Sequence, residues 1–210
     1  KLTLMCEAAL TGLMRQSFGD TLRVIDLNDT PPDADYHVSV MSLPYCLGTR
    51  LETIPASVPY LAVDADTVPD WQDEIGKHAQ GRLKVGLVWA GNPGQSHDYS
   101  RSMTPEPAAT LLDHDGICFF NLLVGPRGNQ LVDAKLIDIR ARLDDFAATA
   151  ALMQNLDLVI SVDSAPAHLA GALGVPVWIM LSFDPDSRYF LKTDASPWYP
   201  SATLFRQSEP

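Results

Sequence analysis

Two loops of this sequence carry residue types that suit the binding of phosphate and sugar groups. The first, residues 89–102, reads WAGNPGQSHDYSRS and contains Gly91, Asn92 and Arg101. Glycine allows a backbone to approach a phosphate closely, and a guanidinium can bind two phosphate oxygens at once. The alternative is a surface turn with a solvated arginine. Because an apolar run typical of a buried strand precedes this loop, we favour the binding interpretation.

The second loop, residues 161–168, reads SVDSAPAH and precedes a run of small residues that is predicted to be a helix. Ser164 and the backbone amides from Ala165 to His168 could bind a diphosphate at the helix N-terminus. Asp163 would repel phosphate there, so we expect it to face another group, such as a sugar hydroxyl. The alternative is that Asp163 or Ser164 only caps the helix and that His168 is a core histidine.

The elements around these loops predict an α/β fold with a doubly wound parallel sheet. Apolar runs typical of buried strands cover residues 83–89, 117–124, 136–139, 158–162 and 175–181. Helical patterns over residues 105–112 and 144–155 lie between them, each with a capping residue or acidic residues at its start. Both loops would lie at the carboxyl edge of this sheet, next to each other if the first and fourth strands pair.

The first 63 residues show a shorter pattern of the same kind. Strands are predicted at residues 2–6, 22–27, 36–41 and 58–63, with a helix at residues 8–16. So short a chain cannot easily cover both faces of a parallel sheet, and the sequence begins at Lys1, directly before a strand-like run. We therefore predict an incomplete Rossmann-like domain over residues 1–63, which suggests that a longer chain precedes it.

The rest of the predicted division places a linker at residues 64–82, with a helix from Pro69 to Gln80, and a complete Rossmann-like domain at residues 83–210. A net charge of -11 argues against nucleic acid or an anionic membrane as a partner. No apolar run approaches the roughly 20 residues of a membrane span. Cys6, Cys46 and Cys118 form no CxxC pair, which favours buried free thiols and a cytoplasmic location.

Several other classes of site lack their sequence signals. The chain contains no GxGxxG, GxxxxGK[ST] or GxSxG motif, which argues against a dinucleotide oxidoreductase, a P-loop phosphotransferase and an α/β-hydrolase. The DxD triplets at residues 64–66 and 184–186 are expected by chance among 26 acidic residues, and the five histidines lack metal-ligand spacing. We therefore predict no metal site.

Taken together, these motifs resemble the heptosyltransferase-like glycosyltransferases. The similarity is greatest to the O-GlcNAc-transferase-like domain that follows tetratricopeptide repeats in bacterial proteins. The matching stretches are VGLVWAGNP at 85–93, RSM at 101–103, DLVISVDSAPAHLAGALG at 157–174, SPWYP at 196–200, and DYH, SLP and LETIP at 35–37, 42–44 and 51–55.

The resemblance implies a GT-B architecture, in which two Rossmann-like domains face each other across a cleft. The C-terminal domain binds the nucleotide-sugar donor, usually without a metal, and no further cofactor is expected. The implied donor contacts are Gly91, Asn92 and Arg101 at the phosphates, Ser164 and the Ala165 amide at the diphosphate, and Asp163 and His168 at the sugar or phosphate.

The sequence departs from this family at the catalytic base. The acidic residue proposed as the base in related enzymes lies in a glycine-rich loop that this chain lacks, which leaves His37 as the candidate. We predict a glycosyltransferase that moves a sugar to an acceptor hydroxyl of a protein or glycan by direct displacement. The alternative is a catalytically silent module that binds a nucleotide or a protein on the same scaffold, and fold alone does not separate the two.

Overall fold

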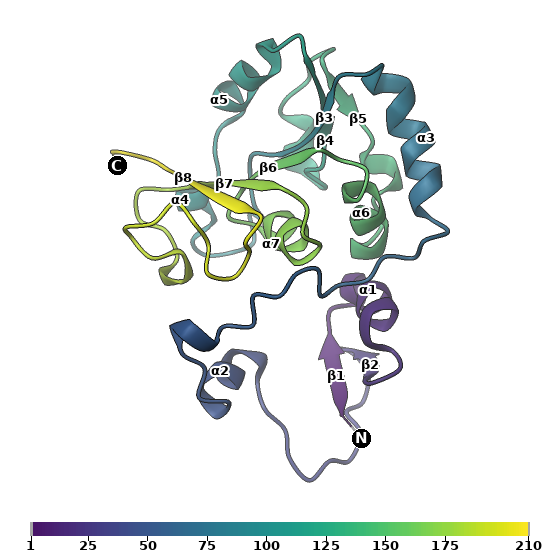
Figure 1. Ribbon diagram of the computed structural model, residues 1–210, viewed down its shortest axis with the longest axis vertical. Helices are drawn as coiled ribbons and strands as arrows, with labels where there is room; N and C mark the ends of the chain where they lie inside the picture. Colours follow the sequence, from purple (N-terminus) through teal and green to yellow (C-terminus); the bar gives the residue numbers. More distant parts are fainter. Residues whose placement is uncertain (1, 210) are drawn as a thin grey trace.

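The computed structural model describes residues 2–209 and contains two parallel sheets of different size (Figure 1). The small sheet consists of β1 (Thr3–Cys6) and β2 (Arg23–Asp26), joined by helix α1 (Ala8–Phe18). Leu13 of α1 is fully buried and belongs to the same core as the large sheet. Helix α1 packs against helix α6 (Phe146–Met153), so the small βαβ unit is attached to the large one through helix packing.

The segment between β2 and residue 67 contains no strand. Its regular elements are short: η1 (Val40–Ser42), α2 (Leu43–Cys46) and η2 (Leu51–Thr53). The strand predicted at residues 36–41 is therefore wrong. This stretch is exposed, with Tyr36 92% accessible, and within residues 2–209 no strand pairs with it, so its amides gain no ladder hydrogen bonds.

The strand predicted at residues 58–63 is also wrong, because its amides bond to partners outside any strand. Tyr60 N donates to Ala172 O of helix α7 (Ala165–Ala172) at 3.1 Å. Ala62 N donates to Ser17 Oγ of α1 at 2.9 Å. This segment therefore connects α1 to α7 instead of extending the small sheet.

Helix α3 (Val68–Ala79) confirms the helix predicted at residues 69–80. It buries Trp71, Ile75 and Ala79, which repeat at intervals of four residues along one face. Gln80 ends the helix in the left-handed conformation, with φ +50°. The helix thus contributes to the core of the large sheet. The division of the chain into domains at residues 1–63, 64–82 and 83–210 stays a prediction.

The large sheet has six parallel strands in the order β5-β4-β3-β6-β7-β8. The strands are β3 (Leu83–Val88), β4 (Ile117–Asn121), β5 (Leu136–Asp138), β6 (Leu158–Val162), β7 (Val177–Leu181) and β8 (Ala202–Arg206). The winding direction reverses between β3 and β6, which is the strand order of a doubly wound Rossmann sheet. Strands β3 and β6, the first and fourth of the predicted strands, do pair, which is the condition under which the two loops were expected to be neighbours.

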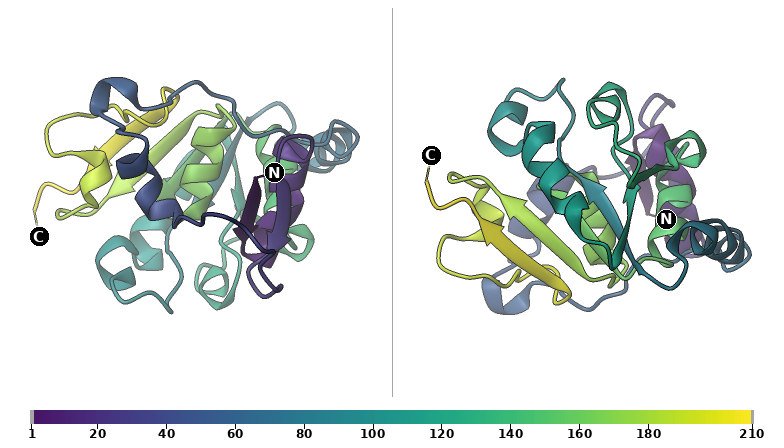
Figure 2. Two further views of the ribbon diagram at one scale, coloured as in Figure 1. Left: turned by 90° about the horizontal axis from the view of Figure 1, so that it is seen from below. Right: turned by 90° about the horizontal axis from the view of Figure 1, so that it is seen from above.

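Helices cover both faces of this sheet. Figure 2 shows α7 on the face seen from below and α5 (Pro105–Thr110) on the face seen from above. The remaining short helices lie in the connections: α4 (Asp98–Arg101), η3 (Leu111–Asp113), η4 (Pro126–Asn129), η5 (Arg140–Arg142) and η6 (Ser187–Tyr189).

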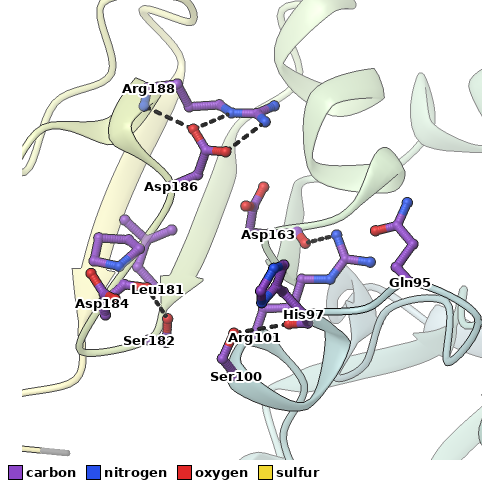
Figure 3. Close-up of a pocket in the computed structure, with 11 residues that line it drawn as sticks. Gln95, His97, Ser100, Arg101, Asp163, Leu181, Ser182, Asp184, Asp186 and Arg188 are labelled. Atoms are coloured by element: carbon purple, nitrogen blue, oxygen red, sulfur yellow. Dashed lines mark hydrogen bonds and ion pairs between the residues drawn. The ribbon is translucent and has the colours of Figure 1, made fainter.

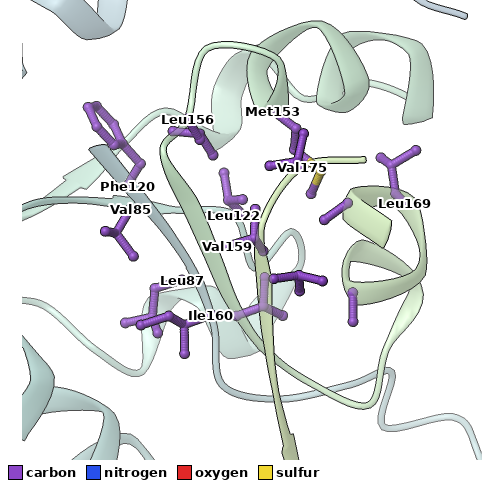
Figure 4. Close-up of a cluster of buried hydrophobic side chains, with 14 of the residues drawn as sticks. Val85, Leu87, Phe120, Leu122, Met153, Leu156, Val159, Ile160, Leu169 and Val175 are labelled. Atoms are coloured by element: carbon purple, nitrogen blue, oxygen red, sulfur yellow. The ribbon is translucent and has the colours of Figure 1, made fainter. Parts of the chain in front are cut away.

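Apolar runs form the strands because both of their faces are buried. Leu87, Phe120, Val159 and Ile160 extend from the central strands into the core shown in Figure 4. A parallel sheet covered on both faces reads as continuous hydrophobic sequence. Burial of one such side chain contributes about 1.5–3 kcal/mol relative to leaving it exposed.

The strand ends differ from the predicted bounds for local reasons. Strand β4 stops at Asn121, whose side chain accepts from Leu123 N at 3.0 Å and donates to Gly128 O at 3.0 Å, turning the chain. Strand β7 begins at Val177 because Pro176 has no N–H to donate. The sequence reading missed β8, which pairs with β7 at the sheet edge.

The cysteines agree with the prediction only in part. All three are free thiols, but Cys118 is buried, Cys6 is half-buried and Cys46 is exposed. Within residues 2–209, no helix has the length and apolar character needed to cross a membrane.

Candidate functional site

The loops after β3 and β6 begin side by side at the carboxyl edge of the large sheet. The register pairs Val88 of β3 with Ser161 of β6. The two predicted binding loops therefore meet at the point where the winding direction reverses. Ligands of open α/β sheets bind in the crevice at this position.

A buried carboxylate organises the loop after β3. Asp98 is 2% exposed and accepts hydrogen bonds from Arg101 Nε at 3.2 Å, from Ser102 Oγ at 3.0 Å and from Arg127 Nη1. Ser102 Oγ in turn accepts from Gly91 N at 2.9 Å. A buried charge is tolerated only when it is paired and hydrogen-bonded, and this network satisfies both conditions.

Arg101 connects the two loops. Its Nη1 donates to the backbone oxygen of Asp163 at 3.1 Å, as Figure 3 shows, although the two residues lie 62 positions apart. Asn92, by contrast, is exposed, and its side-chain oxygen accepts from Gly94 N at 2.9 Å. Arg101 therefore lies at the crevice, whereas Asn92 stabilises the turn beside it.

The loop after β6 leads into helix α7 without a side-chain cap. Ser164 occupies the N-cap position, but its hydroxyl lies 3.0 Å from Ser161 Oγ and makes no hydrogen bond to the helix. Ala167 N donates to Ser164 O at 3.0 Å, and Pro166 has no N–H. The amide of Ala165, the first helical residue, has no intrahelical acceptor by geometry, so it can bind an anion.

Asp163 is held by one of its two carboxylate oxygens. Tyr189 donates its hydroxyl to Oδ1 at 2.7 Å, and His168 Nε2 lies 3.4 Å from the same oxygen. Burial favours the neutral acid, but the hydrogen bonds from His168 and Tyr189 outweigh it and lower the pKa of Asp163. Within residues 2–209 no hydrogen bond reaches Oδ2, so an ionised acceptor is available to a ligand hydroxyl.

His168 is partly exposed and makes polar contacts through both ring nitrogens. Nδ1 lies 3.0 Å from the hydroxyl of Tyr199, and Nε2 lies 3.3 Å from Arg188 Nη1 as well as near Asp163. It is therefore part of the polar cluster at the sheet edge, not a core histidine.

Arg188 and Asp186 form a two-point ion pair on the loop after β7. Nε–Oδ1 and Nη2–Oδ2 are both 2.9 Å. The hydrogen bonds from Arg188 lower the pKa of Asp186 to about 2, and the same contact raises the pKa of Arg188. Asp186 belongs to the DxD triplet at residues 184–186. No cluster of three His, Cys, Asp or Glu side chains that could hold a metal occurs within residues 2–209.

A cavity of about 360 Å³ opens between these three loops (Figure 3). Arg101 and Asp163 line it, together with three residues of the loop after β7: Asp184, Asp186 and Arg188. The wall thus contains three aspartates and two arginines, and each arginine is already bonded to a carboxylate.

The other predicted site residues lie around this cavity or away from it. Gly91, Ser164 and His168 are not among its lining residues. His168 contacts Asp163 and Arg188, which line it, whereas Gly91 donates to Ser102 and Ser164 contacts Ser161. Ala165 is exposed at the start of α7. His37 is exposed on the segment between β2 and η1 and does not line the cavity, so the structure does not bring it together with the others.

Sequence reasoning missed several residues of this site. Asp98 had one signal, its position three residues before Arg101 within a helical turn. Tyr199 lies in the SPWYP motif, but the motif alone does not assign it a role; it is 9% exposed and its hydroxyl lies 3.0 Å from His168 Nδ1. Arg127 had no signal, because it comes from a different connection of the sheet.

The fold and the cavity define a doubly wound α/β protein of the Rossmann type, with a polar site at the switch point of its sheet. Residues 129–209, less than half of the chain, match the family model of Glycosyltransferase family 9 (heptosyltransferase). The match includes helix α7, Asp163 and the SPWYP motif, which confirms the predicted family.

Two known proteins are similar to the chain over most of its length. Protein FlbA of Caulobacter vibrioides is 31% identical over 185 residues, which is 81% of this chain and 30% of FlbA. The chain therefore spans less than a third of that relative. The crystal structure of the glycosyl transferase family 9 protein from Veillonella parvula matches 70% of this chain and 42% of its own, with a TM-score of 0.51 and 18% identity.

The structural match concerns the fold alone, because the sequence identity is low. It supports the Rossmann-like α/β fold with a parallel six-stranded sheet. The predicted pairing of two such domains across a cleft stays a prediction.

Proposed function

We propose that this chain supplies the donor-binding part of a glycosyltransferase that moves a sugar from a nucleotide sugar to an acceptor hydroxyl on a protein or glycan. The observation that carries the proposal is the contact between Arg101 and Asp163 across the switch point of the sheet. It places a cation, a carboxylate and a helix N-terminus beside one polar cavity. The match of residues 129–209 to a glycosyltransferase family supports the same reaction class.

Each part of a nucleotide sugar has a suitable partner at this edge. The diphosphate would accept hydrogen bonds from N–H groups of Arg101 and from the Ala165 amide at the start of α7. A sugar hydroxyl would donate to the available Oδ2 of Asp163. The phosphates would then be bound by N–H groups, whereas the Asp163 carboxylate, which would repel them, would be used by an uncharged hydroxyl.

Displacement at the anomeric carbon needs two further effects. The departing diphosphate must be stabilised, for which Arg101 and the helix N-terminus are suited. A proton must also leave the acceptor hydroxyl, which general-base assistance accelerates by about 10²–10⁴-fold. His37 is our candidate for this base on the grounds of its motif, although it does not line the cavity.

Calorimetric titration with nucleoside diphosphates and nucleotide sugars tests the proposal. Arg101→Ala should weaken binding by about 1.5–3 kcal/mol, the scale of a hydrogen bond to a charged group. Arg23→Ala, at an exposed position of β2, removes the same charge far from the cavity and serves as the control.

Arg101 also pairs with buried Asp98, so its removal should lower the midpoint of thermal unfolding. The titrations are therefore run well below the unfolding midpoints of both variants. Saturable binding that is equally strong in wild type and Arg101→Ala would show that Arg101 does not bind the phosphates.

One observation favours a second candidate, a catalytically silent binding module. Both cavity arginines are already paired, Arg101 with Asp98 and Arg188 with Asp186, which reduces their attraction for phosphate. A silent module would bind a nucleotide or a protein without donor hydrolysis or sugar transfer. Measuring donor hydrolysis with saturating nucleotide sugar separates the two, since turnover above the buffer rate excludes the silent module.

A further inference from the structure

The SPWYP motif at residues 196–200 forms a rigid turn beside the cavity loops. Ser196 Oγ accepts from the amides of Trp198 at 3.2 Å and Tyr199 at 3.3 Å. Pro197 and Pro200 restrict the backbone on either side. A serine hydroxyl that takes two successive amides, between two prolines, fixes the directions in which Trp198 and Tyr199 extend.

The two aromatic residues reach two different groups of the polar cluster. Trp198 Nε1 donates to the backbone oxygen of Arg188 at 3.1 Å. The ring of Tyr199 packs on Gly171 of α7 so closely that a Cβ there would lie 2.4 Å from it, and its hydroxyl lies 3.0 Å from His168 Nδ1. The motif therefore contacts both Arg188 and His168.

His168 Nε2 has two competing partners that exclude each other. Asp163 Oδ1 lies 3.4 Å away and can only accept, because it is a carboxylate. Arg188 Nη1 lies 3.3 Å away and can only donate. When Nε2 carries a proton, it can donate to Asp163. When it carries none, it can accept from Arg188.

The group at Nδ1 determines which of these states is present. In a neutral imidazole one nitrogen donates and the other accepts, and the hydrogen bond at one fixes the state of the other. Burial, followed by the neighbouring hydroxyl of Tyr60, raises the pKa of Tyr199, so its phenol keeps its proton. The phenol can then donate to Nδ1.

We propose that Tyr199 is a positioning residue that donates to His168 Nδ1 and so places the proton of His168 on Nε2, facing Asp163. His168 and Tyr189 then both donate to Oδ1 of Asp163, and Oδ2 is left to accept from a ligand hydroxyl. Arg188, fixed by Trp198 and Asp186, is kept from bonding to Nε2 and retains N–H groups for the cavity.

The proposal is tested first by long-range ¹H–¹⁵N spectra of the histidine side chains at about pH 8, where a free imidazole is neutral. His168 is assigned by the signals that disappear in His168→Gln. In the wild type we expect Nε2 to be protonated and Nδ1 unprotonated. Tyr199→Phe keeps the ring on Gly171 and should shift both ¹⁵N signals toward the other tautomer. Tyr45→Phe, at a 91% exposed position, should leave them unchanged.

A wild-type spectrum with Nδ1 of His168 protonated would overturn the proposal, and this result does not depend on the folding of any Tyr199 variant. Unchanged His168 signals in Tyr199→Phe would overturn it as well. Neither result depends on a ligand, so this arm is decided independently of the proposed function.

A second arm rests on the proposed function and compares each nucleotide sugar with its nucleoside diphosphate: UDP-N-acetylglucosamine with UDP, and the sugar-bearing forms of ADP and GDP with ADP and GDP. Tyr199→Phe should weaken binding of the sugar-bearing ligand about three- to tenfold, the range of one hydrogen bond, and leave the diphosphate unaffected. Equal losses for both ligands would contradict a role through Asp163. If none of these ligands binds the wild type, the proposed function fails, whereas the spectra still decide the tautomer.

Discussion

Replacing Gly91 with alanine tests the packing of the loop after β3. A Cβ at this position would lie 2.4 Å from Asp98 Oδ1, 2.7 Å from Arg101 Nη2 and 2.8 Å from Arg101 Nε. Carbon and polar atoms do not approach this closely, since non-bonded heavy atoms are most stable at about 3.5–4.0 Å. At least one partner of the Asp98–Arg101 ion pair must therefore move.

The neighbouring contacts limit how the pair can adjust. Asp98 is 2% exposed and is also held by Arg127 and Ser102, so its carboxylate cannot turn toward solvent. We expect Arg101 to move and to lose its contact with Asp163 O. Overpacking of this kind typically costs about 1–3 kcal/mol of unfolding free energy. Loss of one charged contact should weaken binding of a nucleoside diphosphate by a similar amount.

Urea denaturation and calorimetric titration of Gly91→Ala measure both effects. Gly116→Ala and Gly76→Ala are matched controls, because a Cβ at either position meets nothing within 4 Å. Gly76→Ala lies inside helix α3 and should stabilise the protein by about 0.5–1 kcal/mol. The reasoning is refuted if Gly91→Ala and Gly116→Ala have the same unfolding free energy and the same ligand affinity.

Three further predictions concern stability. The folded pKa of Asp186 is about 2, below its ordinary 3.8. The ionised carboxylate therefore contributes fully to the free energy of unfolding above about pH 4, and this contribution is lost as the pH falls through 2. Asp186→Asn should therefore lose less stability than the wild type over that interval in urea titrations, and parallel curves would contradict this. Leu13→Ala should cost about 2–5 kcal/mol because Leu13 is fully buried between the two units, whereas Leu27→Ala at a half-exposed position should cost about 0.5 kcal/mol; equal costs would show that α1 does not join the core. Asp145→Ala removes the side-chain cap of α6 and should lower stability by about 0.5–2 kcal/mol in thermal melts. Asp144→Ala removes no cap and is the control, and the loss of stability in Asp145→Ala must be larger than the loss in Asp144→Ala.

The parts of the fold that could be predicted are those in which burial dictates the sequence. Strands such as β6 are covered on both faces, so they require uninterrupted apolar residues, and the polar residues after them identify the carboxyl edge. Asp163 and Arg101 were found in this way, because their loops follow such strands. An apolar run of this kind therefore predicts both the buried strand and the edge of the sheet at which the following loop lies.

The parts that could not be predicted depend on partners distant in the chain. Arg127 reaches Asp98 across 29 positions from the connection between β4 and β5, and no local pattern relates them. The stretch at residues 36–41 has strand-like alternation, but a strand also needs a pairing partner, and within residues 2–209 no strand pairs with it. Strand β8 has only two buried residues, Ala202 and Leu204, which alternate with exposed ones, and so short an alternation is a weak signal in the sequence.

The pairing of the cavity arginines explains how a site with more carboxylates than arginines can still suit an anionic ligand. A free arginine would attract a diphosphate more strongly, but its side chain would lose rotamer freedom on binding, at a cost of up to about 2 kcal/mol. Arg101 is already ordered, since Nε is bonded to Asp98 and Nη1 to Asp163 O, and its guanidinium has five N–H groups in a fixed plane.

Within residues 2–209, no hydrogen bond uses Nη2 of Arg101, so a phosphate can be bound there without reordering the side chain. The same contact fixes the backbone of Asp163, whose Oδ2 is available to a hydroxyl. The carboxylate of Asp98 thus reduces the net charge of the site and, in return, fixes a donor group and an acceptor group in adjacent loops. A ligand with a phosphate next to a sugar hydroxyl presents the complementary pair of groups, whereas inorganic phosphate alone would use only one of them.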